Sequence, residues 1–301
     1  MNPLQNTLDQ FQSPQVIDLA WAILSPPLMV ANPPHHNFST TFYQQAFADF
    51  LPHLQQLNAN PAPLCDFLNQ RKDKRLGPYF EQLWLYWLKH NGRFQCLANN
   101  VQIHDDTRTL GELDLIVKDT QTNEIEHWEL AIKFYLGIAP LTEGTNWFGP
   151  TLNDRLDKKF IQLNTKQLTF VQTPNAQAFC EEQHWVVSRS RLISKGCLFM
   201  PHHAKPCEPA YINSNHVQGT WSSINEFVHY WNQKPATIKV LEKRHWLNQL
   251  GETELPVNGL SGYLSANAVR LPVQVSVEFE GKRYRHFLVT EDWEQRARNS
   301  L

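Results

Sequence analysis

The sequence predicts an α/β fold in which a mixed β-sheet is covered by helices. A helical pattern over residues 76–90 is followed by three β-like runs between residues 94 and 137. Helical periodicity returns over 151–170, and another strand is expected over 184–200. The order of helix, three strands, helix and strand is typical of a compact α/β layer.

Apolar spacing and turn residues place each of these elements. The helix over 76–90 has Pro78 in its first turn and Asn91-Gly92 at its end, which suit a helix start and stop. Its apolar positions share one stripe: Phe80, Leu83, Trp84, Trp87 and Leu88. The three β-like runs are separated by polar turn residues and cover 94–104, 109–118 and 126–137. They predict a three-stranded meander.

Composition changes along the chain predict three regions. Residues 1–75 are expected to be an N-terminal helical extension with a helix over 40–57, and residues 76–204 the α/β core. Residues 205–301 are expected to be a C-terminal α+β module. Within it the pattern predicts a short helix over 221–231 and a β-hairpin that turns at Gly281, with strands over 272–280 and 282–290.

The overall composition is that of an ordinary globular protein. The 301 residues are 42% hydrophobic and 19% charged, with a net charge of -2 and a pI near 6.7. This lack of overall basicity counts against an electrostatically driven nucleic-acid binder unless the basic residues are clustered. The first residues carry no secretory pattern, and five cysteines without framework spacing fit a reducing compartment, so we expect a cytoplasmic protein with no membrane partner.

Charged residues interrupt two of the predicted strands. Alternation along the second strand places Glu112 and Asp114 on one face, and alternation along the third places Glu129, Ala131 and Lys133 on one face. Charged side chains between apolar neighbours on a strand are costly to bury unless they pair or bind a metal. These two strands are therefore the candidate site.

The run Gly111-Glu112-Leu113-Asp114-Leu115-Ile116 resembles the second-strand motif of the PD-(D/E)xK nuclease superfamily. That superfamily has an αβββαβ core, with an acid-x-Lys motif on the third strand. Glu81 matches the acidic residue that many members place on the preceding helix. A longer stretch, including residues 127–136 and 194–201, is similar to a bacterial domain-of-unknown-function family, DUF1853. The resemblance implies a nuclease-like core over residues 76–200.

The resemblance further implies a metal-dependent nuclease that hydrolyses nucleic-acid phosphodiesters, with DNA the expected substrate. Glu81, Asp114 and Glu129 are the implied ligands of Mg²⁺ or Mn²⁺, which prefer carboxylate oxygens. Asp114, Glu129 and Lys133 are the implied catalytic residues. The cation would activate a water, and Lys133 would orient that water and stabilise charge on the phosphate.

The chain departs from the superfamily pattern at one position. The pattern has an acid two residues before the lysine, where this chain has Ala131. Glu129 lies two residues further back on the same face, a displacement of about 6.6 Å at roughly 3.3 Å per residue. The alternative interpretation is that Asp114 and Lys133 form a cross-strand ion pair without catalysis.

Nucleic-acid contacts are expected from the helix that follows the third strand, because basic side chains bind phosphates. The predicted contact residues are Arg155, Lys158, Lys159 and Gln162. By the resemblance, Gln162 and Gln167 are also placed to orient substrate or water. The run of Arg71, Lys72, Lys74 and Arg75 is a weaker phosphate-binding candidate, since charge runs usually form solvated faces.

Two other functions stay open at this point. One is a catalytically decayed nuclease core that binds nucleic acid, which Ala131 and the near-neutral charge favour. The other is a protein-interaction module in which the C-terminal region is the working surface. The sequence favours neither a monomer nor an oligomer.

Overall fold

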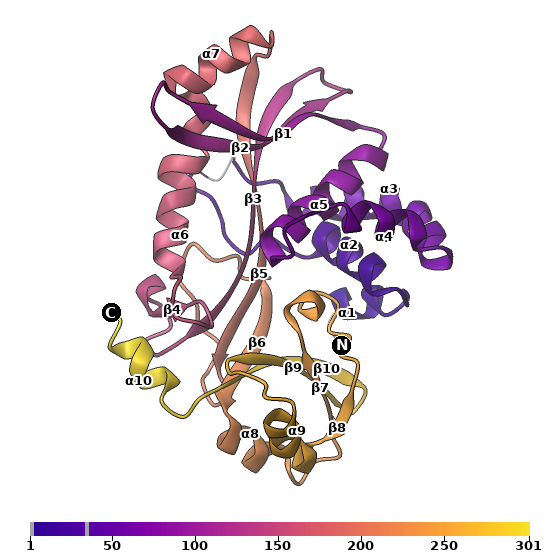
Figure 1. Ribbon diagram of the computed structural model, residues 1–301, viewed down its shortest axis with the longest axis vertical. Helices are drawn as coiled ribbons and strands as arrows, with labels where there is room; N and C mark the ends of the chain where they lie inside the picture. Colours follow the sequence, from indigo (N-terminus) through magenta and orange to yellow (C-terminus); the bar gives the residue numbers. More distant parts are fainter. Residues whose placement is uncertain (1–2, 34–35) are drawn as a thin grey trace. The chain divides into compact units, whose positions relative to one another are not determined.

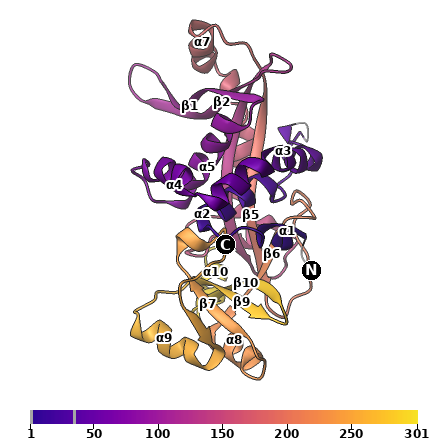
Figure 2. The same ribbon diagram turned by 90° about the vertical axis from the view of Figure 1, so that its right-hand side faces the viewer.

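The computed structural model describes residues 3–33 and 36–301 and confirms a mixed α/β fold in which helices flank a β-sheet (Figures 1 and 2). In these residues the strands are hydrogen-bonded in the order β1-β2-β3-β5-β6-β10-β9-β7-β8, and β4 pairs with β3. The strand bounds are β1 Phe94–His104, β2 Thr109–Asp119, β3 Ile125–Gly137, β4 Trp147–Phe148, β5 Val187–Pro201, β6 Val217–Ser223, β7 Thr237–Leu241, β8 Glu254–Pro256, β9 Val273–Phe279 and β10 Lys282–Val289.

Helices occupy both ends of the chain and the segments between the strands. Their bounds are α1 Pro3–Leu8, α2 Pro14–Leu24, α3 Thr40–Ala59, α4 Ala62–Asn69, α5 Leu76–His90, α6 Leu156–Gln162, α7 Pro174–Glu182, α8 Ile224–Trp231, α9 Leu260–Ala266 and α10 Trp293–Arg298. No helix in the described parts of the chain combines the length and apolar composition that crossing a membrane requires.

The chain divides into two compact units, each assembled from separated segments. We call one the central unit, which comprises residues 22–132 and 158–195. The other, the C-terminal unit, comprises the segment ending at Trp21, residues 133–157 and residues 196–301. Strands β3 and β5 contribute residues to both units, and each unit is described separately below.

The central unit contains most of the predicted meander, apart from the end of β3 that begins at Lys133. Strands β1 and β2 form an antiparallel pair from Phe94–Asp119 to His104–Thr109, and β2 pairs antiparallel with β3. In Figure 1, helices α3 to α5 lie on one side of β3 and α6 lies on the other. Helices therefore lie on both sides of β3, the strand that carries Glu129 (Figure 1).

Trp128 on β3 anchors the face that α3 and α5 cover. Its fully buried ring contacts aromatic rings from both helices, from β1 and from the segment before α3, at centroid distances between 5.0 and 6.5 Å. These neighbours are Phe38, Phe42, Trp84, Trp87 and Phe94. Because side chains alternate along a strand, burying Trp128 here directs Glu129 toward the opposite face.

The predicted helix over 151–170 is shorter and broken in the structure. Leu152 has a φ of 64°, in the left-handed region that a helix cannot use, and α6 begins only at Leu156. After α6 the chain continues as a π-helical turn, Leu163–Gln167, in which the Leu168 N–H donates to the Leu163 carbonyl at 2.9 Å. Helix α7, which the sequence pattern did not predict, follows before β5. Because of α7, the predicted strand over 184–200 begins only at Val187.

The C-terminal unit is built around the predicted hairpin. Strands β9 and β10 pair antiparallel and turn at Gly281, whose φ is 70°. Helices α8 and α9 contribute Phe227 and Leu260 to a core formed with Val275 and Val277 of β9. The predicted helix over 221–231 begins later, at Ile224, because the three preceding residues belong to β6.

Candidate active site

The ladder between β2 and β3 stops at the predicted acids. Backbone pairing runs from Lys118–Ile125 to Leu115–Trp128, and the next opposed residues are Asp114 and Glu129. There the Leu130 N–H donates to Oδ2 of Asp114 at 2.8 Å. Directly opposed residues of antiparallel strands share a face. The end of the ladder therefore sets the two carboxyl groups side by side, and the neighbouring Asp114 raises the pKa of Glu129.

Glu129 is held by a glutamine and is almost completely enclosed. Its side chain is 1% exposed, and its Oε1 accepts a 2.6 Å hydrogen bond from Nε2 of Gln167. Its Oε2 receives no hydrogen-bond donor within the described residues. Gln167 is the last residue of the π-helical turn, a rare conformation that often occurs at functional sites.

Lys159 brings a positive charge to this pair from α6. Its Nζ donates to Oε1 of Gln167 at 2.7 Å, and Gln167 in turn donates to Glu129. The charge of Lys159 lowers the pKa of both Asp114 and Glu129. Lys159 was expected to contact phosphate, and no pattern in the sequence linked it to the acids.

Burial nevertheless dominates the electrostatics of the acid pair. Loss of solvent raises the pKa of Asp114 to about 6, with additional repulsion from Glu81 and Glu112. Burial also raises the pKa of Glu129 well above its usual range, and the neighbouring Asp114 adds to the increase. A buried carboxylate beside a partly buried one is therefore unfavourable unless the two share a proton or hold a cation.

Glu81 and Glu112 lie near the pair without completing a metal site. Glu81 on α5 accepts from Nδ2 of Asn100 at 3.3 Å, and Glu112 on β2 accepts from Nε2 of Gln102 at 2.8 Å. Within residues 3–33 and 36–301, no three His, Cys, Asp or Glu side chains are grouped so that they could hold a metal ion. The role of Glu81 as a third ligand therefore stays a prediction.

His127 lies beneath Glu129 on the same strand face. It is fully buried, its Nδ1 lies 3.2 Å from Oγ of Ser190, and its Nε2 lies 4.0 Å from Oε2 of Glu129. Burial lowers the pKa of His127 to about 4, so the ring is neutral at physiological pH. Strand alternation places His127 on the face of Glu129, a signal in the sequence that the predicted site did not include.

Lys133 belongs to the C-terminal unit, where it has a different partner. Its Nζ donates to Oδ2 of Asp154 at 2.6 Å, and the hydroxyl of Tyr135 donates to the same oxygen at 3.3 Å. Both members of this ion pair remain about one-third exposed. Asp154 is thus the carboxylate that balances the charge of Lys133.

The predicted nucleic-acid contacts lie in and before α6, in different environments. Arg155 makes a two-point ion pair with Asp157, with N–O distances of 2.6 and 2.9 Å. Lys158 and Gln162 are exposed on α6. Lys158 and Gln162 are therefore accessible to a ligand, whereas the Arg155 guanidinium is already bound to a carboxylate.

A family model described as a domain of unknown function, DUF1853, matches residues 17–275 of the chain. The chain belongs to this family. Comparisons with curated proteins and with solved structures gave no significant match. The match includes both strands that carry the acid pair, so the pair lies inside the DUF1853 region.

The acid pair of this DUF1853 chain offers carboxylate oxygens, the donor type that Mg²⁺ and Mn²⁺ prefer. The Glu129 oxygen that lacks a donor is buried, and a buried acceptor left unsatisfied is costly. A cation between Glu129 and Asp114 would satisfy that oxygen and remove the repulsion between the carboxylates. Because Mg²⁺ commonly binds through one or two carboxylates and retains several waters, the residues present fit it.

Proposed function

We propose that this chain is a divalent-cation-dependent nuclease that hydrolyses nucleic-acid phosphodiesters, with DNA as the expected substrate. The observation that carries the proposal is the Asp114–Glu129 pair at the end of the β2–β3 ladder, in which Glu129 is buried and Asp114 is partly buried. Oε2 of Glu129, which has no hydrogen-bond donor among the described residues, favours a cation that binds oxygen ligands. The nearby Lys159 favours an anionic substrate. The order of these acids on the second and third strands also agrees with the superfamily resemblance.

In this proposal two acids hold the cation and two neighbouring groups orient the acids. Asp114 and Glu129 hold Mg²⁺ or Mn²⁺, which when bound lowers the pKa of a water and neutralises charge on the scissile phosphate. The Leu130 N–H fixes Asp114, and Gln167 fixes the orientation of Glu129. Orienting both acids in advance reduces the reorganisation that the reaction needs.

The ammonium group that stabilises the transition state has two candidates. Lys133 is the candidate from the sequence pattern, and its charge is balanced by Asp154. Lys159 is the candidate from the geometry, because its charge acts on both acids. Because Glu129 lies opposite Asp114, Glu129 takes the place of the motif's second acid. The superfamily motif then has its lysine two residues later, where this chain has Ala131. We therefore assign to Lys159 the stabilisation of charge developing on the phosphate.

Cleavage assays on single-stranded, duplex, nicked and branched DNA and on RNA, with Mg²⁺ or Mn²⁺, test the proposal. Asp114→Asn should abolish cutting, and Lys159→Ala should slow it by about a hundredfold at saturating substrate, as loss of a transition-state contact does. Lys158→Ala is the matched control on the same helix and should keep the saturated rate. If Lys133→Ala slows cutting and Lys159→Ala does not, the assignment of the lysine is wrong.

Cation binding can be measured without any substrate. Mn²⁺ should raise the melting temperature of the wild-type protein, since a ligand that binds only the folded state stabilises it. The Asp114→Asn variant should lose that rise. If the rise persists in the variant, the cation binds elsewhere and the acid pair is not its site.

The alternative function is a non-catalytic module that binds nucleic acid. The observations that favour it are the near-neutral charge of the chain and the Arg155–Asp157 ion pair, which occupies a predicted phosphate ligand. Protein that binds DNA or RNA and cuts none of the substrates with either cation would support this alternative. Protein that does neither would leave the protein-interaction function.

A further inference from the structure

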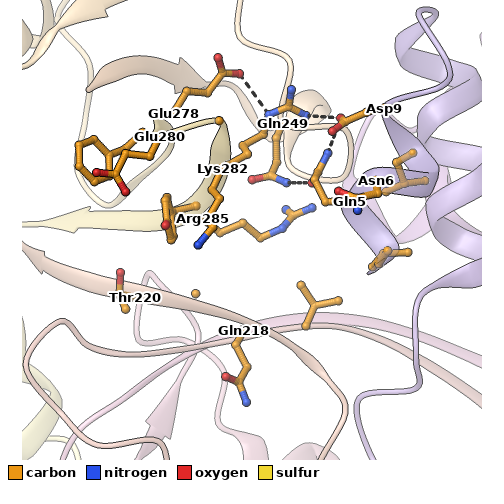
Figure 3. A pocket seen from close by; sticks show the side chains of 18 of the residues that line it. Gln5, Asn6, Asp9, Gln218, Thr220, Gln249, Glu278, Glu280, Lys282 and Arg285 are labelled. Carbon is orange, nitrogen blue, oxygen red and sulfur yellow. Dashed lines mark hydrogen bonds and ion pairs between the residues drawn. The ribbon is translucent and has the colours of Figure 1, made fainter. Parts of the chain in front are cut away.

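The C-terminal unit contains a cavity where two parallel strands separate. Strands β6 and β10 are hydrogen-bonded only from Thr220–His286 to Ser223–Val289. The residues before this ladder diverge and line a cavity of about 800 Å³, together with helix α1 and the turn of the β9–β10 hairpin (Figure 3). This volume lies within the range of about 300–1,000 Å³ that small-molecule sites occupy.

A buried guanidinium forms part of the cavity wall. Arg285 is 7% exposed and donates to the carbonyl oxygens of Trp246 and of Leu247, the latter at 2.7 Å. No carboxylate lies within ion-pair distance of Arg285 in the described residues, and Asp18 acts on it only at longer range. Burial lowers the pKa of Arg285 to about 10, so it stays charged at neutral pH. A buried charge with only neutral partners is costly.

The other charges of the cavity are mostly matched to one another. Arg283 lies 3.2 Å from both Asp9 and Glu278, and Lys239 lies 3.7 Å from Glu278, so both carboxylates on that side of the wall have cationic partners. Lys282 has no ion-pair partner among the described residues, and Figure 3 shows it reaching into the hollow as Arg285 does. The remaining acid, Glu280, lies at the exposed hairpin turn.

A buried acceptor and an apolar surface complete the wall. Gln249 is 3% exposed, and its Nε2 donates to Oε1 of Gln5 at 3.0 Å, while its own Oε1 receives no donor in the described part of the chain. Leu8, Met200 and Val217 supply buried apolar lining. The cavity thus offers two cations, one unsatisfied acceptor and a hydrophobic surface.

We propose that this cavity binds a small organic phosphate, with the dianionic group between Arg285 and Lys282. A phosphate monoester carries close to two negative charges near neutral pH, which matches two cations better than a single carboxylate does. The planar guanidinium has five N–H donors, of which two bonds are to carbonyls, so donors remain for phosphate oxygens. A hydroxyl or amino group of the ligand donates to Gln249, and its apolar part contacts Met200 and Val217. This site does not depend on the nuclease proposal.

Calorimetric titration of the full chain in EDTA tests the proposal with defined probes. Adenosine 5′-monophosphate and glucose 6-phosphate are the phosphate probes, glucuronate is the carboxylate counterpart of the sugar phosphate, and inorganic phosphate lacks the organic part. At least one organic phosphate should bind more tightly than glucuronate and inorganic phosphate. Equal binding of glucuronate, or no binding of either organic phosphate at millimolar concentration, would overturn the assignment.

Variants locate the binding and separate it from the acid pair. Lys282 is exposed, so Lys282→Ala should fold normally and weaken phosphate binding by about tenfold or more, which corresponds to about 1.4 kcal/mol. Arg270→Ala removes an exposed cation of the same unit outside the cavity and should leave the affinity unchanged. Asp114→Asn should also bind the phosphate normally. Unchanged affinity in Lys282→Ala, or loss in Asp114→Asn, would show that the phosphate binds elsewhere.

Discussion

The Asp114→Asn variant should be more stable than the wild-type protein at neutral pH when divalent cations are removed. Asparagine has nearly the same shape as aspartate, so its side-chain oxygen can still accept from the Leu130 N–H. Its amide group can donate toward Glu129, whose Oε2 has no donor within the described residues. The substitution thus replaces a repulsion between the buried Glu129 carboxyl group and its partly buried neighbour with a hydrogen bond.

The size of the effect follows from the pKa of Asp114. Burial chiefly raises this pKa from 3.8 to about 6, so the folded state holds the proton more tightly than the unfolded state. The contribution to stability is therefore complete below about pH 4 and is lost as the pH rises through 6. A shift of roughly two units corresponds to about 3 kcal/mol at most. Glu129, whose pKa is also raised, changes stability in the same direction.

Urea unfolding in EDTA, from roughly pH 4.5 to about pH 8, measures this difference in stability. The unfolding midpoint of the wild-type protein should fall with rising pH, while that of Asp114→Asn should fall less and exceed it at neutral pH. Asp106→Asn makes the same chemical change at an exposed position of the β1–β2 connection and should follow the wild type. Parallel curves for wild type and Asp114→Asn would refute the buried-pair argument.

Alternation along strands predicted the part of the fold that carries the acids. The predicted bounds of β1, β2 and β3 differ from the observed ones by at most one residue. Around the acids the sequence alternates charged and apolar residues, as in Glu112-Leu113-Asp114-Leu115, which is the two-residue period of a strand. The same period predicted that Glu129 and Ala131 share a face away from Trp128.

Elements that depend on distant partners were not predictable in this way. Strand β6 contains Gly219 and several polar residues, and it is stabilised by pairing with β5 on one side and β10 on the other. Strand β8 has only three residues, too few to show a period. Helix α6 starts late because Leu152 adopts a positive φ, which spacing of apolar residues does not reveal.

In the candidate site too, only the residues whose positions follow from strand alternation could be predicted. Asp114 and Glu129 could be selected because strand geometry alone fixes their faces. The link from Lys159 through Gln167 to Glu129 depends on where α6 and its π-helical turn are packed. A lysine motif along one strand therefore pointed to Lys133, whose partner in the structure is Asp154.

Three further predictions test packing, capping and substrate contact. Ser223→Ala removes the N-cap of α8 and should cost about 1 kcal/mol in urea unfolding, and no loss would contradict the capping box. Lys158→Ala should reduce the slope of log affinity against log salt by about 1 if this exposed lysine contacts a phosphate, and an unchanged slope excludes that contact. Gly111→Ala tests whether packing of the Phe170 ring on Gly111 holds the segment that follows the π-helical turn. The added Cβ would lie 2.6 Å from that ring. The ring must move, so we expect a loss of roughly 1–3 kcal/mol and slower cutting, because Phe170 closely follows the glutamine that orients Glu129. Gly77→Ala, whose Cβ would meet nothing within 4 Å, is the matched control and should unfold at the wild-type midpoint or above it. Equal stability of the two variants would show that the ring does not hold this segment in place.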